Sequence, residues 1–283
     1  MTKSRYLAAI LLALGTGLGS VLAAPEAAVP LAELSHIHGV EYEGRSGAIL
    51  LATHHGVYRF EPGDPAILIS PDRSDYMGFT ALSDGTVIAS GHPEAGGNLG
   101  VLKSSDSGAR WIKISDGADG PVDFHAIAAA GNDANVLYGL HQGGIQASSD
   151  AGETWRWTGD APAQTFDIAS SEDGETLFAA TSAGIRVSTD GGKNWGAIPG
   201  DLPAPTSAVA MLNNHLYAYV LGHGFVRRAI EETSWQVLAP DIGGIILLHL
   251  AQYPRDTQRL VAVTQESVVL ESRDGGSSWS PLE

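Results

Sequence analysis

The sequence predicts an all-β protein, a six-bladed β-propeller of four-stranded antiparallel blades. Three observations lead to this prediction. Glycine accounts for 35 of the 283 residues, too many for a helical bundle, because glycine inside a helix is costly. Short alternating apolar segments recur between turn-forming residues, as they do in antiparallel strands. These segments repeat every 40 or 44 residues, a period typical of propellers with four strands in each blade.

A tryptophan-containing pattern marks the repeat. Four segments share the pattern S-x-D-x-G-x-x-W, and a fifth keeps only its tryptophan, Trp235. The five tryptophans are Trp111, Trp155, Trp195, Trp235 and Trp279, which follow one another at 44, 40, 40 and 44 residues. Apolar residues in the same phase extend the count to six repeats, the first without the pattern: Val57, Val101, Ile145, Ile185, Phe225 and Val269.

Each repeat is expected to contain four strands. In the first repeat the alternation predicts strands over His38–Tyr42 and Ala48–Thr53 and a third strand that begins at Gly56. The tryptophan of each pattern segment is expected to open the fourth strand. Equivalent second strands are predicted over Val136–Leu140, Leu177–Thr181 and Leu260–Thr264, and equivalent third strands from Gly144 and Gly184.

The four pattern segments resemble the Asp-box (BNR) motif of sialidases, sortilin-type receptors and photosystem-assembly propellers. The resemblance implies that each segment forms the turn between the third and fourth strands, away from the ligand-binding end of the propeller. The serine and aspartate can bond the turn backbone, glycine can adopt a positive φ, and tryptophan can pack beside the hairpin. Four aspartates are therefore expected to be structural: Asp106, Asp150, Asp190 and Asp274.

The N-terminal segment has the features of a secretory signal peptide. Lys3 and Arg5 precede an apolar stretch over Tyr6–Leu14, and small residues end at Ala23, where cleavage is expected. Residues 1–23 are therefore predicted to be removed, and residues 24–283 to form a single propeller domain. The protein is expected to be periplasmic or secreted, with no membrane span after signal cleavage.

Composition excludes several kinds of site. The chain has no cysteine, so it has no disulfide, no thiolate metal site and no cysteine nucleophile. The formal net charge of −16 at pH 7 disfavours a surface that binds the phosphates of nucleic acid, and no nucleic-acid partner is expected. Histidine and methionine are then the soft or borderline metal ligands that remain.

Nine of the ten histidines are predicted to gather at one end of the central channel, here called the mouth. Antiparallel connectivity brings the starts of first strands and the ends of second strands to the same face. Only His215 falls in a turn at the opposite face. The nine are His36, His38, His54, His55, His92, His125, His141, His223 and His249.

Alignment of the first strands singles out three of these positions. Each first strand has an apolar residue at the same phase of the repeat. In the first three repeats, the residue two positions before it is His38, Met77 and His125. Period-two alternation would point them the same way. Imidazole and thioether ligands together favour copper, although another transition metal could bind. We therefore expect a copper site formed by His38, Met77 and His125, with His36, His54, His55, His92 and His141 nearby.

The expected function is the binding of this metal ion for buffering, delivery or resistance. A glycoside hydrolase of the sialidase-like type is one alternative, because such enzymes share the motif and use paired carboxylates. Asp123 and Asp167 could form such a pair, but the arginine cluster of sialidases has no counterpart at the mouth. The mouth acids are Glu33, Asp75, Glu94, Asp123, Asp167 and Asp241.

A second alternative is a scaffold that binds another exported protein. Residues 93–98 lengthen one loop at the mouth, and such a loop can contact a ligand or a partner. The sequence thus leaves a metal-binding protein, a hydrolase and a scaffold as three functional classes on one predicted fold.

Overall fold

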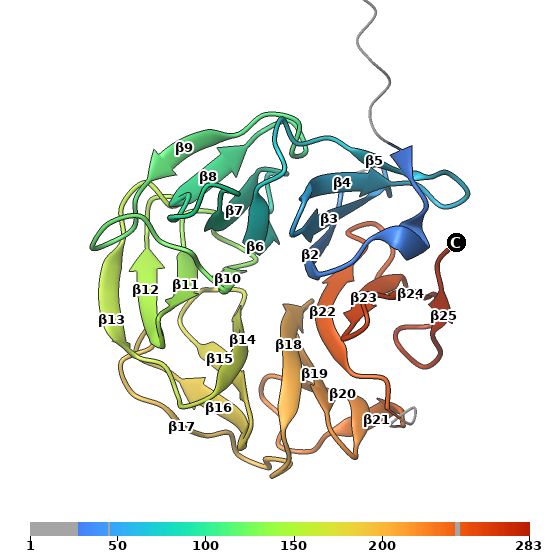
Figure 1. Ribbon diagram of the computed structural model, residues 1–283. Helices are drawn as coiled ribbons and strands as arrows, with labels where there is room; N and C mark the ends of the chain where they lie inside the picture. Colours follow the sequence, from blue (N-terminus) through green and yellow to red (C-terminus); the bar gives the residue numbers. More distant parts are fainter. Residues whose placement is uncertain (1–27, 45, 241–243) are drawn as a thin grey trace, which may run out of the picture.

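Six antiparallel sheets surround a central axis in the computed structural model, which describes residues 28–44, 46–240 and 244–283 (Figure 1). This arrangement confirms the predicted six-bladed propeller. The predicted signal peptide, residues 1–23, lies outside the described residues, as does Asp241. Within the described ranges, no helix has the length and apolarity needed to cross a membrane.

Within each blade, consecutive strands lie side by side from the axis outward. The innermost strands are β2 (Ile37–Tyr42), β6 (Asp75–Ala81), β10 (Ala126–Ala129), β14 (Thr165–Ser170), β18 (Thr206–Leu212) and β22 (Leu247–Gln252). The second strands are β3 (Ile49–Thr53), β7 (Val87–His92), β11 (Leu137–His141), β15 (Leu177–Thr181), β19 (His215–Val220) and β23 (Leu260–Thr264).

The outer half of each blade holds the third and fourth strands. The third strands are β4 (Gly56–Phe60), β8 (Val101–Ser104), β12 (Gly144–Ser148), β16 (Gly184–Ser188), β20 (Gly224–Ala229) and β24 (Val269–Ser272). The fourth strands are β5 (Ala66–Leu68), β9 (Ile112–Ser115), β13 (Arg156–Asp160), β17 (Gly196–Ala197), β21 (Gln236–Ala239) and β25 (Ser280–Pro281). Blade 1 gains a fifth strand, because β1 (Ala28–Val29) pairs with β5, and a short 3₁₀ helix, η1 (Leu31–Glu33), follows it.

The S-x-D-x-G-x-x-W segments form turns between third and fourth strands. In blade 3, the hydroxyl of Ser148 donates to Asp150 Oδ1 at 2.8 Å and accepts the N–H of Gly152 at 2.9 Å. The same Asp150 oxygen accepts the N–H of Thr154 at 2.8 Å, and the indole of Trp155 donates to the carbonyl of Gly152 at 2.9 Å. The serine and aspartate therefore satisfy the backbone of the turn, and the fourth strand begins directly after the tryptophan.

The hydrophobic core is divided among the contacts between blades. Six apolar clusters each join two consecutive blades, and the one between blades 6 and 1 closes the ring. Each pattern tryptophan packs against the cluster shared with the preceding blade, as Trp155 does between blades 2 and 3. The closing cluster has no such tryptophan, and Tyr42, Tyr58 and Phe60 fill it instead. Ring closure thus depends on side-chain packing between blades rather than on a shared strand.

A β-bulge interrupts five of the six innermost strands near the mouth. The pairing of β2 with β3 skips His38, and the pairing of β6 with β7 shifts between Tyr76 and Phe79, next to Met77. Register shifts at the same level in blades 4, 5 and 6 leave out Phe166, Ser207 and Leu248. A bulged residue is left unpaired, and the regular alternation of side chains is interrupted there. Strict period-two alternation therefore does not run through these positions, which are equivalent in five blades.

Candidate metal centre

The candidate metal centre lies at the mouth, where the innermost strands of blades 1 and 2 begin. His38 occupies the bulge of β2, and His54 follows β3 at the same end of blade 1. The backbone N–H of His54 donates to the carbonyl oxygen of His36 at 3.2 Å, which holds these two segments together. Asp75 opens β6 directly opposite His92, the last residue of β7. Strand pairing within the two blades therefore supplies three imidazoles and one carboxylate to the same place.

Close packing of β6 and β7 beside Asp75 requires a glycine. Gly91 has a φ of +156°, and a Cβ atom at this position would collide with the carbonyl oxygen of Asp75. Glycine here lets the two backbones approach. The strand pair that carries Asp75 and His92 is therefore held close by a residue without a side chain.

Three histidine Nε2 atoms surround the carboxylate of Asp75. His54 Nε2 lies 3.1 Å from Asp75 Oδ2, His92 Nε2 lies 3.5 Å from the same oxygen, and His38 Nε2 lies 3.7 Å from Oδ1. Ligand atoms of His38, His54 and Asp75 all lie within 4.8 Å of one another. This is the geometry of a group that can share one cation.

Two atoms of this group face each other without a hydrogen bond. Nε2 of His38 and Oδ1 of Asp75 are both buried and have no hydrogen-bond partner in the part of the chain that the structure describes. The Asp75 side chain is only 10% exposed, so water does not readily satisfy it. Buried polar atoms are nearly always hydrogen-bonded, so an unpaired facing couple calls for an explanation such as an ion or a water molecule between the two atoms.

A second carboxylate lies beside the first. Asp123, just before β10, places Oδ2 3.8 Å from His92 Nε2 and 3.6 Å from His125 Nε2. Its carbonyl oxygen accepts a hydrogen bond at 2.8 Å from Nδ1 of His141, which must carry the proton because a carbonyl can only accept. Oδ1 of Asp123 is buried and has no hydrogen-bond partner among the described residues. The imidazole of His92 therefore lies between two carboxylates from neighbouring blades.

Burial sets the protonation of the group. It lowers the pKa of His38 to about 4, and the neighbouring imidazoles of His54, His249, His36 and His125 act in the same direction. His38 is thus neutral at pH 7, with a lone pair available for a metal. Burial raises the pKa of the Asp75 carboxyl, although the nearby histidines oppose this effect.

The remaining histidines of the predicted site lie around this group with different roles. The ring of His36 stacks on that of His54 at a centroid distance of 4.5 Å, and His55 meets His54 edge-on at 6.4 Å. His141 is buried and positions the backbone of Asp123. Met77 is half-buried beside the register shift of β6.

Three further histidines lie apart from the carboxylates. His223 is in the exposed turn between β19 and β20 at the mouth face. His249 lies on β22 and lines the central cavity, where burial lowers its pKa to about 4. At the opposite face, Nδ1 of His215 donates to the carbonyl oxygen of Asn213 at 2.9 Å.

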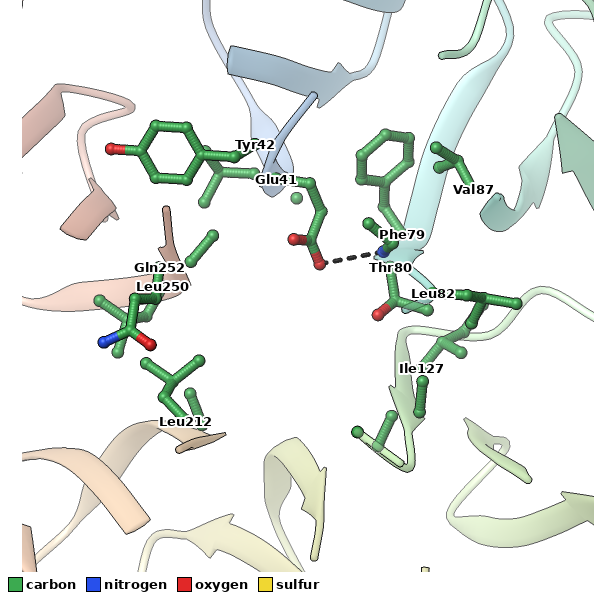
Figure 2. A pocket seen from close by; sticks show the side chains of 18 of the residues that line it. Glu41, Tyr42, Phe79, Thr80, Leu82, Val87, Ile127, Leu212, Leu250 and Gln252 are labelled. Carbon is green, nitrogen blue, oxygen red and sulfur yellow. Dashed lines mark hydrogen bonds between the residues drawn. The ribbon is translucent and has the colours of Figure 1, made fainter. Parts of the chain in front are cut away.

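The part of the channel away from the mouth holds a cavity of about 660 Å³ (Figure 2). Its wall is formed by the later halves of the innermost strands and the turns that follow them. Glu41 projects into it and accepts the N–H of Ala81 in the next blade at 3.1 Å. Asp167 accepts the N–H of Ile168 at 2.9 Å and that of Val209 in the next blade at 3.0 Å. Burial raises the pKa of Glu41 and of Asp167 to about 7.

These contacts correct one sequence-based expectation. The proposed pairing of Asp123 with Asp167 is wrong, because Asp167 binds backbone N–H groups in the cavity wall while Asp123 faces His92 and His125. The carboxylates that share an imidazole are Asp75 and Asp123. The sequence interpretation treats both only as hydrolase acids, although their position at first-strand starts beside the histidines is the signal that could have placed them in the candidate metal centre.

Comparison with known proteins supports the fold. No protein-family model and no curated protein matches the sequence. Among solved structures, the GH74 enzyme of Niastella koreensis is similar with a TM-score of 0.63 at 16% identity, over 91% of this chain and 46% of that one. The chain therefore spans less than half of that enzyme.

Two protein-binding propellers are also similar. YCF48 bound to a D1 peptide matches with a TM-score of 0.56 at 18% identity, over 92% of this chain and 86% of that one. A chain of a nidogen/laminin complex matches with a TM-score of 0.62 at 14% identity, over 83% of this chain and 93% of that one. At these identities the likeness shows the propeller fold alone.

Proposed function

We propose that the protein binds a divalent transition metal ion at the mouth, through His38, His54 and Asp75. The observation that carries the proposal is the facing pair of buried, unpaired atoms, His38 Nε2 and Asp75 Oδ1. Their separation of 3.7 Å is too long for a hydrogen bond. Two ligands bonded at 2.0–2.2 Å to a tetrahedral ion lie about 3.4 Å apart, close to this separation.

Protonation supports binding at neutral pH. A metal ion needs deprotonated ligands, and each proton that must leave weakens binding. Because the pKa of His38 is about 4, its Nε2 or Nδ1 is free of an extra proton at pH 7. Burial raises the pKa of Asp75, and a cation placed between His38 and Asp75 would offset the charge of the buried carboxylate.

We propose copper as the ion, in its divalent state. The group around Asp75 offers imidazole nitrogen and carboxylate oxygen, a donor set that suits Cu²⁺ or Zn²⁺. Copper binds such sets more tightly than zinc in the general order of divalent affinities. The thioether of Met77 would add a preference for Cu⁺, and the proposal does not depend on it. Buffering, delivery or resistance then follows as the role of an exported protein that holds copper.

The test is calorimetric titration of the metal-free protein with Cu²⁺ and, separately, Zn²⁺. Asp75→Asn keeps the size of the side chain but removes its charge, and it should weaken copper binding by at least about 100-fold. His215→Ala is the matched control, because His215 is a half-buried histidine at the opposite face and should leave binding unchanged. A wild-type protein that binds no metal, or an Asp75→Asn variant that binds as tightly as wild type, overturns the proposal. Tighter zinc than copper binding overturns the choice of ion.

A protein partner at the mouth is the second candidate function. Exposed aromatic side chains favour it: Phe166, at the bulge level of β14, is 53% exposed, and Trp157 on β13 is 41% exposed. Structural neighbours of this chain include propellers that bind a peptide or a protein. Capture of the same partner by wild type and by the Asp75→Asn variant would favour this function over metal binding. Cleavage of aryl glycosides by metal-free protein would instead favour the hydrolase.

Two further assignments complete the proposal. The turns built on Ser148 and Asp150 have the hydrogen bonds that the Asp-box resemblance implies, which supports membership of the Asp-box (BNR) propellers. Export is proposed from the predicted signal peptide over residues 1–23. The N-terminal sequence of the mature protein, isolated from the periplasm or the medium, checks it, with Ala24 expected as the first residue.

A further inference from the structure

The mouth repeats part of the Asp75 arrangement one blade further along. Asp123 in blade 3 is 13% exposed, and its Oδ1 atom is buried without a hydrogen-bond partner in the described chain, as Oδ1 of Asp75 is. Its other oxygen faces two imidazole nitrogens, of His92 at 3.8 Å and of His125 at 3.6 Å. Both distances exceed a hydrogen bond. Ligand atoms of Asp123, His92 and His125 do not all lie within 4.8 Å of one another, as those of His38, His54 and Asp75 do, so this group is more open than the first.

We infer that the mouth holds a second divalent metal ion, bound by Asp123, His125 and His92. This inference rests on the proposed function, because it assumes that the first ion is held by His38, His54 and Asp75. Each centre then has two or three imidazoles and one carboxylate. His92 is the residue that can serve either centre, since its Nε2 lies 3.5 Å from Asp75 and 3.8 Å from Asp123.

The backbone around Asp123 is held in position. His141 donates to its carbonyl oxygen, and the N–H of Phe124 donates to the hydroxyl of Ser90 in the neighbouring blade at 3.0 Å. The Phe124 ring is fully buried in the cluster between blades 2 and 3. His141 is thus a positioning residue for the second centre, and the carboxylate of Asp123 stays at the mouth without a metal to hold it there.

Charge at the mouth favours two cations rather than one. Within the described residues, the ion pairs of Asp75 and Asp123 are formed with histidines alone, and no lysine or arginine takes part. In these pairs no permanently cationic side chain offsets the negative charge of the two carboxylates. One divalent ion at each carboxylate offsets this negative charge where it lies.

The two centres should differ in strength. The side chain of His125 is 62% exposed, whereas that of His38 is 22% exposed. Water competes for the more exposed ligand, so the second ion should bind more weakly than the first. A titration should therefore show two successive events rather than one.

Copper titration of the full mature chain, with elemental analysis after desalting, tests the inference. Wild type should bind two Cu²⁺ per chain, and Asp123→Asn and His125→Ala should each bind one, with the tighter affinity retained. His215→Ala again serves as the control and should bind two. Circular dichroism and the melting temperature of each metal-free variant establish that it is folded.

The outcomes separate this inference from the proposed function. One ion per wild-type chain, abolished by Asp75→Asn but unaffected by Asp123→Asn, leaves the proposed function standing and overturns the second centre. No bound ion overturns both. Two ions in both Asp123→Asn and His125→Ala overturn the assignment of the second site to these residues.

Discussion

Two pairs of carboxyl groups lie along the central channel in different surroundings. Glu41 and Asp167, in the cavity wall, accept hydrogen bonds from backbone N–H groups of the following blades. Asp75 and Asp123, at the mouth, face histidines and each keep one buried oxygen without a hydrogen bond. The side-chain chemistry is nearly the same in both places, so the difference lies in what surrounds it.

The satisfied pair ties neighbouring blades together, and the unsatisfied pair is available to a ligand. A buried acceptor that bonds a backbone N–H stabilises the fold, whereas an unpaired one costs free energy unless something binds it. Buried carboxylates in this propeller can therefore be sorted into structural and functional groups by their hydrogen bonds. The predictions below test that sorting.

The largest expected effects separate Asp75 from Asp167: the Asp75 variant should lose copper affinity, and the Asp167 variant should lose stability. Asp75→Asn should lose at least about 100-fold in copper affinity while its free energy of unfolding without metal stays within about 0.5 kcal/mol of wild type. Asp167→Ala should keep its copper affinity but lose about 2 kcal/mol of stability at pH 5, because two backbone N–H groups lose their acceptor. Metal titration and urea unfolding of both variants measure the two halves. If both variants lost equal copper affinity, or equal stability, the distinction between functional and structural carboxylates would be wrong.

A pH dependence of stability should come from the cavity pair. The pKa of Glu41 in the folded protein, about 7, lies above its ordinary value of 4.5, so its contribution to stability is complete below pH 4.5 and is lost as the pH rises through 7. Glu41→Gln keeps an oxygen for the N–H of Ala81 but cannot ionise. The stability of this variant relative to wild type should therefore rise by roughly 2–3 kcal/mol between pH 5 and pH 8.

Urea unfolding at the two pH values checks this prediction. Glu94→Gln, on an exposed loop, supplies the control and should follow the wild-type pH profile. A Glu41→Gln variant whose stability changes with pH in parallel with wild type would show that Glu41 ionises normally in the folded state.

Acid should empty the two proposed metal centres in order. The neighbouring carboxylate of Asp123 raises the pKa of His125, while burial lowers that of His38 to about 4. Protons therefore compete for His125 at a higher pH, and the second ion should leave at a higher pH than the first. Copper released during acid titration, followed with a chromogenic chelator, should appear in two steps. Release from His125→Ala should show only the step at lower pH.

The smallest expected effect lies outside both pairs. Asp150 is a half-buried carboxylate that accepts from Ser148 and from the N–H and hydroxyl of Thr154. Asp150→Ala should cost about 1 kcal/mol of stability and leave copper binding unchanged. Urea unfolding and titration measure both. A loss of copper affinity would mean that this turn communicates with the mouth and is not merely structural.

The fold could be predicted in detail because its signal is repeated. Trp111, Trp155, Trp195 and Trp279 mark turns in four blades, and the predicted strands Leu177–Thr181 and Leu260–Thr264 match β15 and β23 residue for residue. The pairing of β1 with β5 was not predicted, because a strand of two residues has no periodicity to detect. Repetition made the blades predictable, whereas β1, the strand outside the repeat, was not predicted.

The candidate site could be predicted only in part. The phase of the repeat brought His36, His38 and His54 to the mouth, where the structure finds them stacked or tilted against one another. The bulges could not be foreseen, since nothing in alternation distinguishes a skipped residue from a paired one. Contacts between blades could not be predicted from the sequence either. The sequence therefore did not identify Asp75 as the partner of His38 and His54.

The bulge level offers a practical consequence for protein engineering. His38, Phe166, Ser207 and Leu248 occupy equivalent backbone positions that the strand ladder leaves out. Substitutions there need not disturb the pairing that builds each blade. The mouth thus offers equivalent side-chain positions around one scaffold. A designer could move the ligand set to other blades by substituting a few of these side chains.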